Sequence, residues 1–330
     1  MRLAVAALPV AAILAALPAA GQTGADPLAW LQRSAASARQ TNYAGTVMHM
    51  QGERTATSRI THVFIAGSEH ERIESLDGPR HEIVRHDDQL QCYFPDAKTI
   101  RIDRRVTARF FPSMVNGPLE AIAGNYRVAL GKVERVLGRD CQWIHLDPKD
   151  ALRYAQRLCA EVGSGLLLRA KTMGPGHHVL EQYAFTDLRV GGAVSRGELK
   201  STFLSESRDW RRDVQPGEEH RPGPTGWTVE SPPPGFRLVG EIQRMLPARS
   251  LPVTQLVLSD GIAAISVFVE PTADRSRTSE ANNADGALSV FVRPMGEHVV
   301  TVLGEVPPAA AQQVGRSVAM QAGAAGVPTK

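Results

Sequence analysis

The chain has 330 residues, with 37 Lys and Arg against 34 Asp and Glu, and a net charge of +3. A single hydrophobic core rarely grows beyond about 250 residues, so this length predicts two domains. The small charge, with arginines scattered among acidic residues, excludes a nucleic-acid binder, whose basic side chains gather on one face or helix.

The N-terminus has the pattern of an export signal. Arg2 precedes an apolar run over residues 3–17, and small residues at 19–21 form a cleavage site. Residues 1–21 are therefore predicted to be a signal peptide. A membrane anchor would need about 20 unbroken apolar residues, and no later run in the sequence has that length. The mature protein is expected to be soluble outside the cytoplasm.

Residues 24–205 are predicted to form a large, mostly β domain. Asp26 as N-cap and Pro27 at the first helical position begin a helix that runs to about Thr41. Alternating apolar residues separated by turn residues then predict strands. These strands cover 43–50, 57–66, 71–76, 80–85, 89–94, 99–103, 127–137, 141–146, 154–161, 165–172 and 179–190, with a short helix near 118–123. Their spacing predicts one large antiparallel sheet, curved or partly closed, with the helices as its cover.

An apolar insertion interrupts this pattern at residues 110–115, where Phe110, Phe111, Met114 and Val115 surround a proline. Such a segment is too apolar for a solvent-exposed loop and too proline-bound for a regular strand. It is interpreted either as a core plug on the concave face of the sheet or as the lining or gate of a ligand cavity, since irregular segments move more readily than packed strands.

Three cysteines in an oxidising compartment predict one disulfide and one remaining thiol. If residues 141–146 and 154–159 pair as antiparallel strands, Cys141 and Cys159 face each other and a cross-strand disulfide can form. Three buried thiols are the alternative. Cys92, in the middle of a strand, is interpreted as a small core residue rather than a nucleophile.

The composition changes at residues 206–225, which are polar and rich in Pro and Gly and are predicted to be a linker. Residues 226–322 are predicted to form a small α+β domain. It has a hairpin of strands 253–258 and 262–270 around Asp260-Gly261, and a second hairpin of 287–293 and 298–304. A mobile loop is predicted over 272–285 and a closing helix over 308–320.

The search for catalytic or metal-binding chemistry yields no site. His81 and His86 are five residues apart in a strand-like stretch and point to opposite faces, unlike the ligands of a zinc helix. His177 and His178 follow a Gly-Pro-Gly turn and are interpreted as a solvated rim. No nucleophile elbow or phosphate-binding loop is present in the sequence. We predict no enzyme activity, no cofactor and no metal, and expect a binding protein.

Several short motifs together resemble the RseB/MucB family. They occur in order along both predicted domains and read NYAGT (42–46), RIESLDGP (72–79), CYFPD (92–96), GLLLR (165–169), LEQ (180–182), PGF (234–236), SDG (259–261), VFVEP (267–271) and GEVP (304–307). Each motif alone is weak, but the ordered set is specific.

The resemblance implies a periplasmic negative regulator of a sigma-E-type envelope-stress response. The first domain would be an unclosed β-barrel wrapped over helices, as in the lipoprotein carriers LolA and LolB. One implied partner is the periplasmic segment of a membrane anti-sigma factor like RseA or MucA, which the protein would shield from site-1 proteolysis. The other is lipid or lipopolysaccharide fragments, whose binding would release the anti-sigma segment. Nucleic acid is not an expected partner, and the oligomeric state stays open, with a homodimer among the alternatives.

Two sets of residues are the candidates for these contacts. The apolar concave face of such a half-barrel could take acyl chains, at roughly 0.8 kcal/mol per buried methylene group. Its candidate lining is Met48, Phe64, Ile73, Ile83, Tyr93, Phe110, Phe111 and Met114. A partner peptide could add as a strand to an exposed edge of the second domain. The candidates in that region are Val267, Phe268, Phe291 and Arg293.

Two other functions compete with this hypothesis. A carrier or chaperone for lipids or lipoproteins would explain the first domain but not the presence of the second. An envelope hydrolase would rest on the scattered histidines alone.

Overall fold

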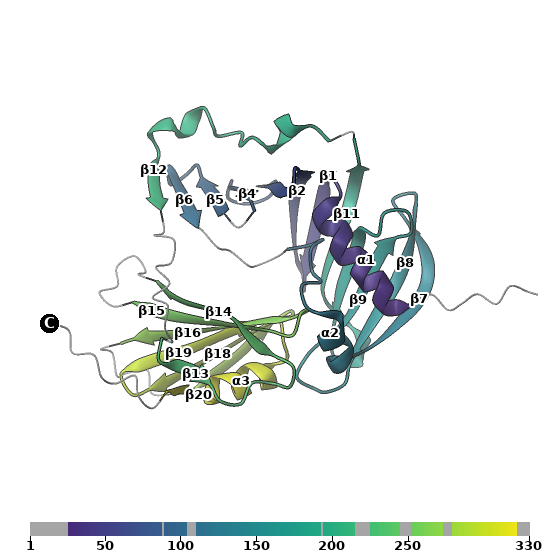
Figure 1. Ribbon diagram of the computed structural model, residues 1–330. Coiled ribbons are helices and arrows are strands. Elements are labelled where there is room, and N and C mark those ends of the chain that lie inside the picture. Colours follow the sequence, from purple (N-terminus) through teal and green to yellow (C-terminus); the bar gives the residue numbers. More distant parts are fainter. Residues whose placement is uncertain are drawn as a thin grey trace, which may run out of the picture.

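The computed structural model describes residues 26–87, 89–103, 110–192, 194–214, 225–244, 252–272 and 279–321. The predicted signal peptide lies outside these residues. Within them the strands form a 12-stranded sheet, a 6-stranded sheet and a two-stranded pair. Figure 1 shows the two large sheets as separate bodies, each with its own helix cover. The prediction of a mostly β protein with unclosed sheets is confirmed.

The larger sheet is a meander in which neighbours in the chain are mostly neighbours in space, and it does not close. Its order is β12-β6-β5-β4-β3-β2-β1-β11-β10-β9-β8-β7, so β12 and β7 form its two edges. Its strands are β1 (Tyr43–Gln51), β2 (Arg54–Ile65), β3 (Ser68–Ser75), β4 (Glu82–His86), β5 (Gln89–Phe94), β6 (Thr99–Asp103), β7 (Tyr126–Val136), β8 (Arg139–Pro148), β9 (Ala155–Glu161), β10 (Leu167–Met173), β11 (Val179–Val190) and β12 (Arg211–Val214). Every strand predicted for the first domain is present.

Two helices pack on one face of this sheet, which we call the helix-bearing face. In α1 (Pro27–Gln40) the Asp26 side chain accepts a hydrogen bond from the Leu28 amide at 2.9 Å, as its N-cap position predicts. Leu31 of α1 and Ile122 of α2 (Leu119–Asn125) are fully buried in a core with residues of β1, β2 and β7–β11. The helical spacing of apolar residues thus predicted the helix that covers this face.

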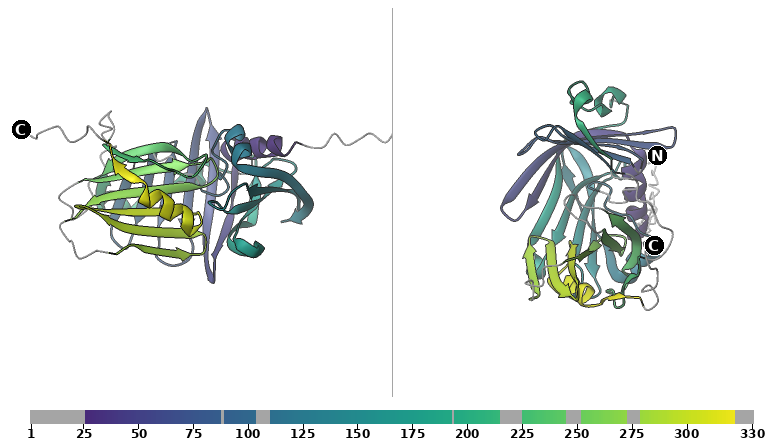
Figure 2. Two further views of the ribbon diagram at one scale, coloured as in Figure 1. Left: turned by 90° about the horizontal axis from the view of Figure 1, so that it is seen from below. Right: turned by 90° about the vertical axis from the view of Figure 1, so that its left-hand side faces the viewer.

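The opposite face of β3–β6 is covered by residues 195–214, which we call the strap. The strap contains η2 (Arg196–Leu199), η3 (Glu206–Asp209) and β12, which pairs in parallel with β6. Phe203 and Trp210 of the strap pack with Tyr93, Ile100 and Ile102. Figures 1 and 2 show the strap on the side of the first sheet away from the second domain. Part of the predicted linker, residues 211–214, is therefore a strand of the first sheet.

A disulfide joins Cys141 and Cys159, as predicted, with Cα atoms 5.6 Å apart. The register of β8 and β9 differs from the predicted one by two residues, because Cys159 lies opposite Trp143 and Cys141 lies opposite Glu161. The two cysteines are thus diagonal neighbours on the face opposite the helices. They pack with Leu168 in a small hydrophobic cluster on that face. Cys92 is a free cysteine.

The second domain is a six-stranded sheet of order β14-β15-β16-β19-β18-β17, covered on one face by α3 (Pro308–Arg316). Its strands are β14 (Arg237–Arg244), β15 (Val253–Ser259), β16 (Ala264–Pro271), β17 (Ala281–Asp285), β18 (Leu288–Met295) and β19 (His298–Gly304). A Cβ at Gly315 of α3 would collide with the Phe291 ring, so glycine allows the helix to approach the sheet this closely.

Three elements of this domain differ from the sequence prediction. The closing helix was expected to reach residue 320 but ends at Arg316, because β20 (Val318–Met320) pairs with β13 (Trp227–Val229). The loop predicted over 272–285 ends in the edge strand β17. Strand β14 was not predicted, since it follows a proline-rich stretch and lacks a regular apolar alternation.

Candidate functional site

The eight predicted cavity residues do not share one cavity. Cross-strand pairing places Ile60, Ile73 and Ile83 in one row on the helix-bearing face, and Phe64 lies on the same face by alternation along β2. Ile73 packs against the core below α1. By the same alternation Met48 faces the other side, because its neighbour Val47 belongs to that core.

The apolar insertion is divided between core and surface. Phe111 is 5% exposed, with its ring centroid 5.2 Å from that of Phe185 and 5.8 Å from that of Tyr183. Met114 and Val115 pack into the same core. Phe110, in contrast, is 49% exposed. The core interpretation therefore holds for three of the four residues, whereas Phe110 alone has the exposure that a gate would need.

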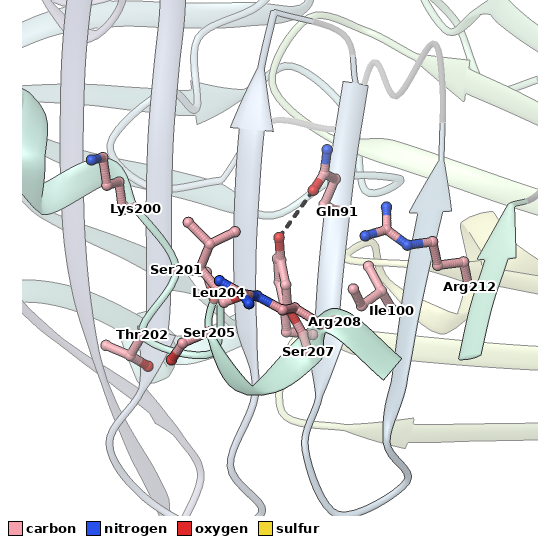
Figure 3. Close-up of a pocket in the computed structure, with 11 residues that line it drawn as sticks. Gln91, Ile100, Lys200, Ser201, Thr202, Leu204, Ser205, Ser207, Arg208 and Arg212 are labelled. Atoms are coloured by element: carbon pink, nitrogen blue, oxygen red, sulfur yellow. Dashed lines mark hydrogen bonds between the residues drawn. The ribbon is translucent and has the colours of Figure 1, made fainter. Parts of the chain in front are cut away.

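Tyr93 lines a pocket on the face opposite the helices, between the strap and strands β5 and β6 (Figure 3). The pocket has a volume of about 590 Å³. It is lined by Gln91, Tyr93, Ile100, Lys200, Ser201, Thr202, Leu204, Ser205, Ser207, Arg208 and Arg212. Tyr93 and Ile100 form an apolar floor, and the Tyr93 hydroxyl donates to Gln91 Oε1 at 3.1 Å.

The rim of this strap pocket is cationic. Lys200, Arg208 and Arg212 are exposed at its edge, and no acidic residue is among its lining. Figure 3 shows Arg208 and Arg212 reaching over the pocket from η3 and β12. Arginine presents planar donors that match phosphate and carboxylate oxygens. The pocket therefore combines an apolar floor with a rim suited to an anionic group.

Glu82 fixes the strap over this pocket. It is fully buried and accepts hydrogen bonds from the Thr202 amide at 3.1 Å and from Arg72 Nη2 at 2.7 Å. Burial by itself would raise the pKa of Glu82, but hydrogen bonds from Arg72, Thr202 and Ser201 hold that pKa below its ordinary value. Sequence reasoning did not single out this residue, because its contact with Thr202 joins residues 120 positions apart in the chain.

The predicted partner-binding residues lie on inner strands of the second sheet. β16 is flanked by β15 and β19, and β18 by β19 and β17. Val267 and Phe291 are fully buried beneath α3. Arg293 Nε donates to the Gly315 carbonyl at 2.7 Å, so it closes the end of that helix. The edges of the sheet are β14 and β17, and Leu238 and Val239 of β14 are more than half exposed.

The two domains meet at a buried ion pair that the sequence did not reveal. Arg153, in the turn between β8 and β9, reaches Asp260 of the second domain with Nη1 and Oδ2 2.9 Å apart, and both side chains are 0% exposed. The Tyr126 hydroxyl donates to the same oxygen at 3.1 Å, and Arg153 also donates to the Pro234 carbonyl. The guanidinium carbon lies over the rings of Tyr126 and Phe236, 5.6 and 5.2 Å from their centroids.

Further contacts extend this interface along both domains. The Asn116 amide donates to the Gly261 carbonyl at 2.9 Å, and Gln51 Nε2 donates to the Asp285 carbonyl at 2.9 Å. Leu152 of the first domain packs into the second core, while Ile262 packs into the first. The short Asp260-Gly261 turn, predicted only as a hairpin, is therefore also the centre of the domain interface.

The histidines that raised the alternative of an enzyme do not form a metal site. Among the described residues no group of three or more His, Cys, Asp or Glu side chains is arranged to hold a metal ion. His81 and His178 each lie near a backbone carbonyl of their own turn. Within the described part of the chain, no helix is long and apolar enough to cross a bilayer.

Comparison with known proteins gives one consistent result over both domains. Residues 26–203 match the MucB/RseB N-terminal domain and residues 221–319 match the MucB/RseB C-terminal domain. The chain is 30% identical over 316 residues to the sigma factor AlgU regulatory protein MucB of Pseudomonas aeruginosa, covering 94% of this chain and 96% of that protein. It is 23% identical to the sigma-E factor regulatory protein RseB of Salmonella typhimurium, covering 94% and 96%.

Solved structures agree with the sequence comparison. A structure of the Pseudomonas aeruginosa MucA/MucB complex contains a chain that matches with a TM-score of 0.70 and 27% identity, covering 90% of this chain and all of that one. A structure of MucB alone matches with a TM-score of 0.67 and the same identity, covering 91% and 99%. The match therefore includes both domains and not only a common sheet. From these matches over nearly its whole length, the chain belongs to the MucB/RseB family.

Proposed function

We propose that this protein is a periplasmic negative regulator of a sigma-E-type stress response, which binds the periplasmic segment of a membrane anti-sigma factor and shields it from site-1 proteolysis. The observation that carries this proposal is the two-domain match to MucB, which covers 90% of this chain in a structure of the MucA/MucB complex. Export by cleavage of residues 1–21 is part of the proposal. The protein acts by binding and not as an enzyme.

The finer architecture implied by the family is an unclosed barrel wrapped over helices. Supporting it, α1 and α2 bury Leu31 and Ile122 against the helix-bearing face of a sheet with free edges. The strand-addition mode for the partner is supported better by β14 than by the inner strands β16 and β18. β14 is an edge of the sheet, and its Leu238 and Val239 are more than half exposed.

Binding of the partner is tested with the periplasmic segment of the anti-sigma factor from the same genome. Isothermal titration should detect a complex, and that segment should resist the site-1 protease only when the protein is present. Val239→Lys should weaken the complex if the segment adds to β14. Val133→Lys, on the exposed edge strand β7 of the other sheet, is the matched control and should not. No complex with the wild-type protein would refute the proposed function.

Release by lipid is proposed to begin at the strap pocket. Its apolar floor of Tyr93 and Ile100 and its rim of Lys200, Arg208 and Arg212 fit an anionic lipid, with acyl groups inside and phosphate at the rim. Thermodynamic coupling between two ligands is reciprocal. If the lipid weakens binding of the anti-sigma segment, the complex with that segment must bind the lipid less tightly than the free protein does. The helix-bearing face supports this role less well, because Phe111 and the helices fill much of it.

Vesicles containing lipid A should bind the protein and displace the anti-sigma segment, whereas neutral phosphatidylcholine vesicles should do neither. The variant with Arg208→Glu and Arg212→Glu should lose the response, and Arg316→Glu on α3 should keep it. Displacement that is equal for both kinds of vesicle would contradict an anionic site. Co-purifying acylated cargo that is passed to an acceptor, without any anti-sigma complex, would favour the alternative carrier function.

A further inference from the structure

Two histidines are stacked on the face of the first sheet that the strap covers. His70 of β3 and His86 of β4 are direct cross-strand partners, and their ring centroids are 4.4 Å apart. His70 faces away from the helices by alternation along β3, because Ile73, three residues on, lies on the helix-bearing face. Imidazole changes its charge between about pH 5 and 8, so this pair can respond to pH in water.

The same cross-strand row supports the beginning of the strap. Val63 of β2 is the partner of His70 on its other side. It is buried in an apolar cluster with Val194 and with Leu199 of η2, and η2 contacts both β2 and β3. We call residues 194–197 the strap entry. A charge on His70 therefore lies one strand, about 4.8 Å, from the apolar contact that holds the strap entry.

We propose that His70 and His86 form a pH-sensitive switch beneath the strap entry, which stays packed while both rings are neutral and loosens when the pair is protonated. Neutral rings can stack at this distance, whereas a charge on one ring opposes a charge on the other. A charged ring also requires water, which the packed strap entry displaces. This inference concerns the first domain alone and does not depend on the proposed function.

The charges next to the pair oppose its protonation more than they favour it. Burial, followed by the charge of His86, lowers the pKa of His70 from its ordinary 6.5. Arg196 of η2 lowers this pKa further. Asp87 acts in the other direction, and its Oδ2 lies 3.8 Å from His86 Nε2.

The other charged groups on this face keep their charge over the same pH range. Arg72, two residues along β3, is paired with Glu82 at 2.7 Å. Hydrogen bonds from Arg189 and from a backbone amide lower the pKa of Glu198 in η2 below its ordinary 4.5. A backbone hydrogen bond lowers the pKa of Asp87 below 3.8. Both carboxyl groups thus stay ionised where the histidines titrate.

The direction of the pH effect follows from proton linkage. Because packing of the strap entry lowers the pKa of His70, the packed state binds fewer protons than the loosened state below pH 6.5. Packing is therefore complete above 6.5 and is lost as the pH falls through the lowered pKa. One proton changes the equilibrium by at most about tenfold per pH unit. The strap beyond its entry stays in place, because Glu82 holds Thr202.

Hydrogen exchange of the full-length protein, followed by NMR, tests this switch. The reporters are the amides of Val194, Ser195 and Gly197, which donate hydrogen bonds close to the strap entry. Their protection, corrected for the intrinsic exchange rate, is measured from about pH 8 to about pH 5. It should fall in the wild type as the pH drops below 6.5. His70→Gln, which cannot be protonated, should remove the fall. His81→Gln, in the turn that joins β3 to β4, is the matched control and should keep it.

Three results would overturn the proposal. The first is wild-type protection of the strap entry that does not change with pH, and this result requires no variant. The second is the same fall in His70→Gln as in the wild type. The third is an equal fall over residues 205–210, which would indicate general loosening of the strap. An NMR titration of the imidazole rings gives an independent measurement, in which His70 should titrate below 6.5 in the wild type, and titration above that value would contradict the switch.

Discussion

Arg153 is a fully buried cation, and its stability depends on partners from both domains. Asp260 neutralises it at 2.9 Å, and it lies over the rings of Tyr126 and Phe236. Removing one member of a buried ion pair leaves an uncompensated charge and costs about 3–5 kcal/mol. We therefore expect Asp260→Ala to lower the free energy of unfolding by about that amount, as measured by chemical denaturation.

An exposed pair on the same protein provides the comparison for this prediction. Arg316 and Glu280 are 2.7 Å apart but largely in water, where ion pairs contribute little. Arg316→Ala should leave the unfolding midpoint nearly unchanged. Equal effects of the two substitutions would mean that burial does not distinguish the pairs. A double variant, Arg153→Met with Asp260→Leu, should recover part of the loss because it removes both charges.

At the scale of single elements, the strap depends on an ionised Glu82. The net lowering of the Glu82 pKa means that its hydrogen bonds stabilise the fold above its ordinary value of 4.5 and are lost as the pH falls through the lowered value. Glu82→Gln should therefore increase hydrogen exchange over residues 198–210 at neutral pH. In the wild type the same increase should appear only on strong acidification.

The control for the strap is Glu206→Gln, since Glu206 lies within the strap but is exposed. Exchange over 198–210 should be unaffected in that variant. If Glu82→Gln leaves exchange unchanged as well, then packing of Phe203 and Trp210 alone holds the strap in place.

The disulfide is an independent stabilising device of the β8–β9 hairpin. It closes a loop with a sequence separation of 18 residues. Loop closure of this size stabilises a fold by about 3 kcal/mol, mainly by restricting the unfolded chain. The Cys141→Ala, Cys159→Ala variant should lose stability of that order in thermal unfolding. Cys92→Ala, which removes the free thiol, should cost less, and a reductant should then have no further effect on the double variant.

For the whole molecule, the domain interface relies on a close approach of two glycines. A Cβ at Gly117 would collide with the backbone of Gly261, which itself has a φ of +95°. Gly117→Ala should therefore cost about 1–3 kcal/mol through overpacking, and it should enlarge the radius of gyration in solution scattering as the domains separate.

Gly124 is the matched control for that substitution. It lies in α2 of the same domain, and a Cβ there would meet no atom within 4 Å. Gly124→Ala should leave the radius of gyration unchanged and should stabilise the helix slightly, because alanine has the higher helix propensity. An enlarged particle in both variants would show that Gly117 does not act through the interface.

Local sequence chemistry determined much of this protein. The Asp26-Pro27 start of α1, the alternating strands of the meander, the Asp260-Gly261 hairpin and the choice of cysteines all follow from interactions between residues close in the chain. Ordered motifs over both domains were also sufficient to identify the family. These features are predictable because turn residues and alternation act over a few residues at a time.

Only the tertiary structure decided which residues meet across long distances in the sequence. Strand alternation could not tell that Tyr93 faces the strap while Ile73 and Ile83 face the helices, since either face of a strand can be apolar. Neither could it show that Phe291 belongs to the core or that Arg153 meets Asp260. Each of these contacts depends on sheet order and domain docking, which sum many weak interactions between remote segments and leave no local signal.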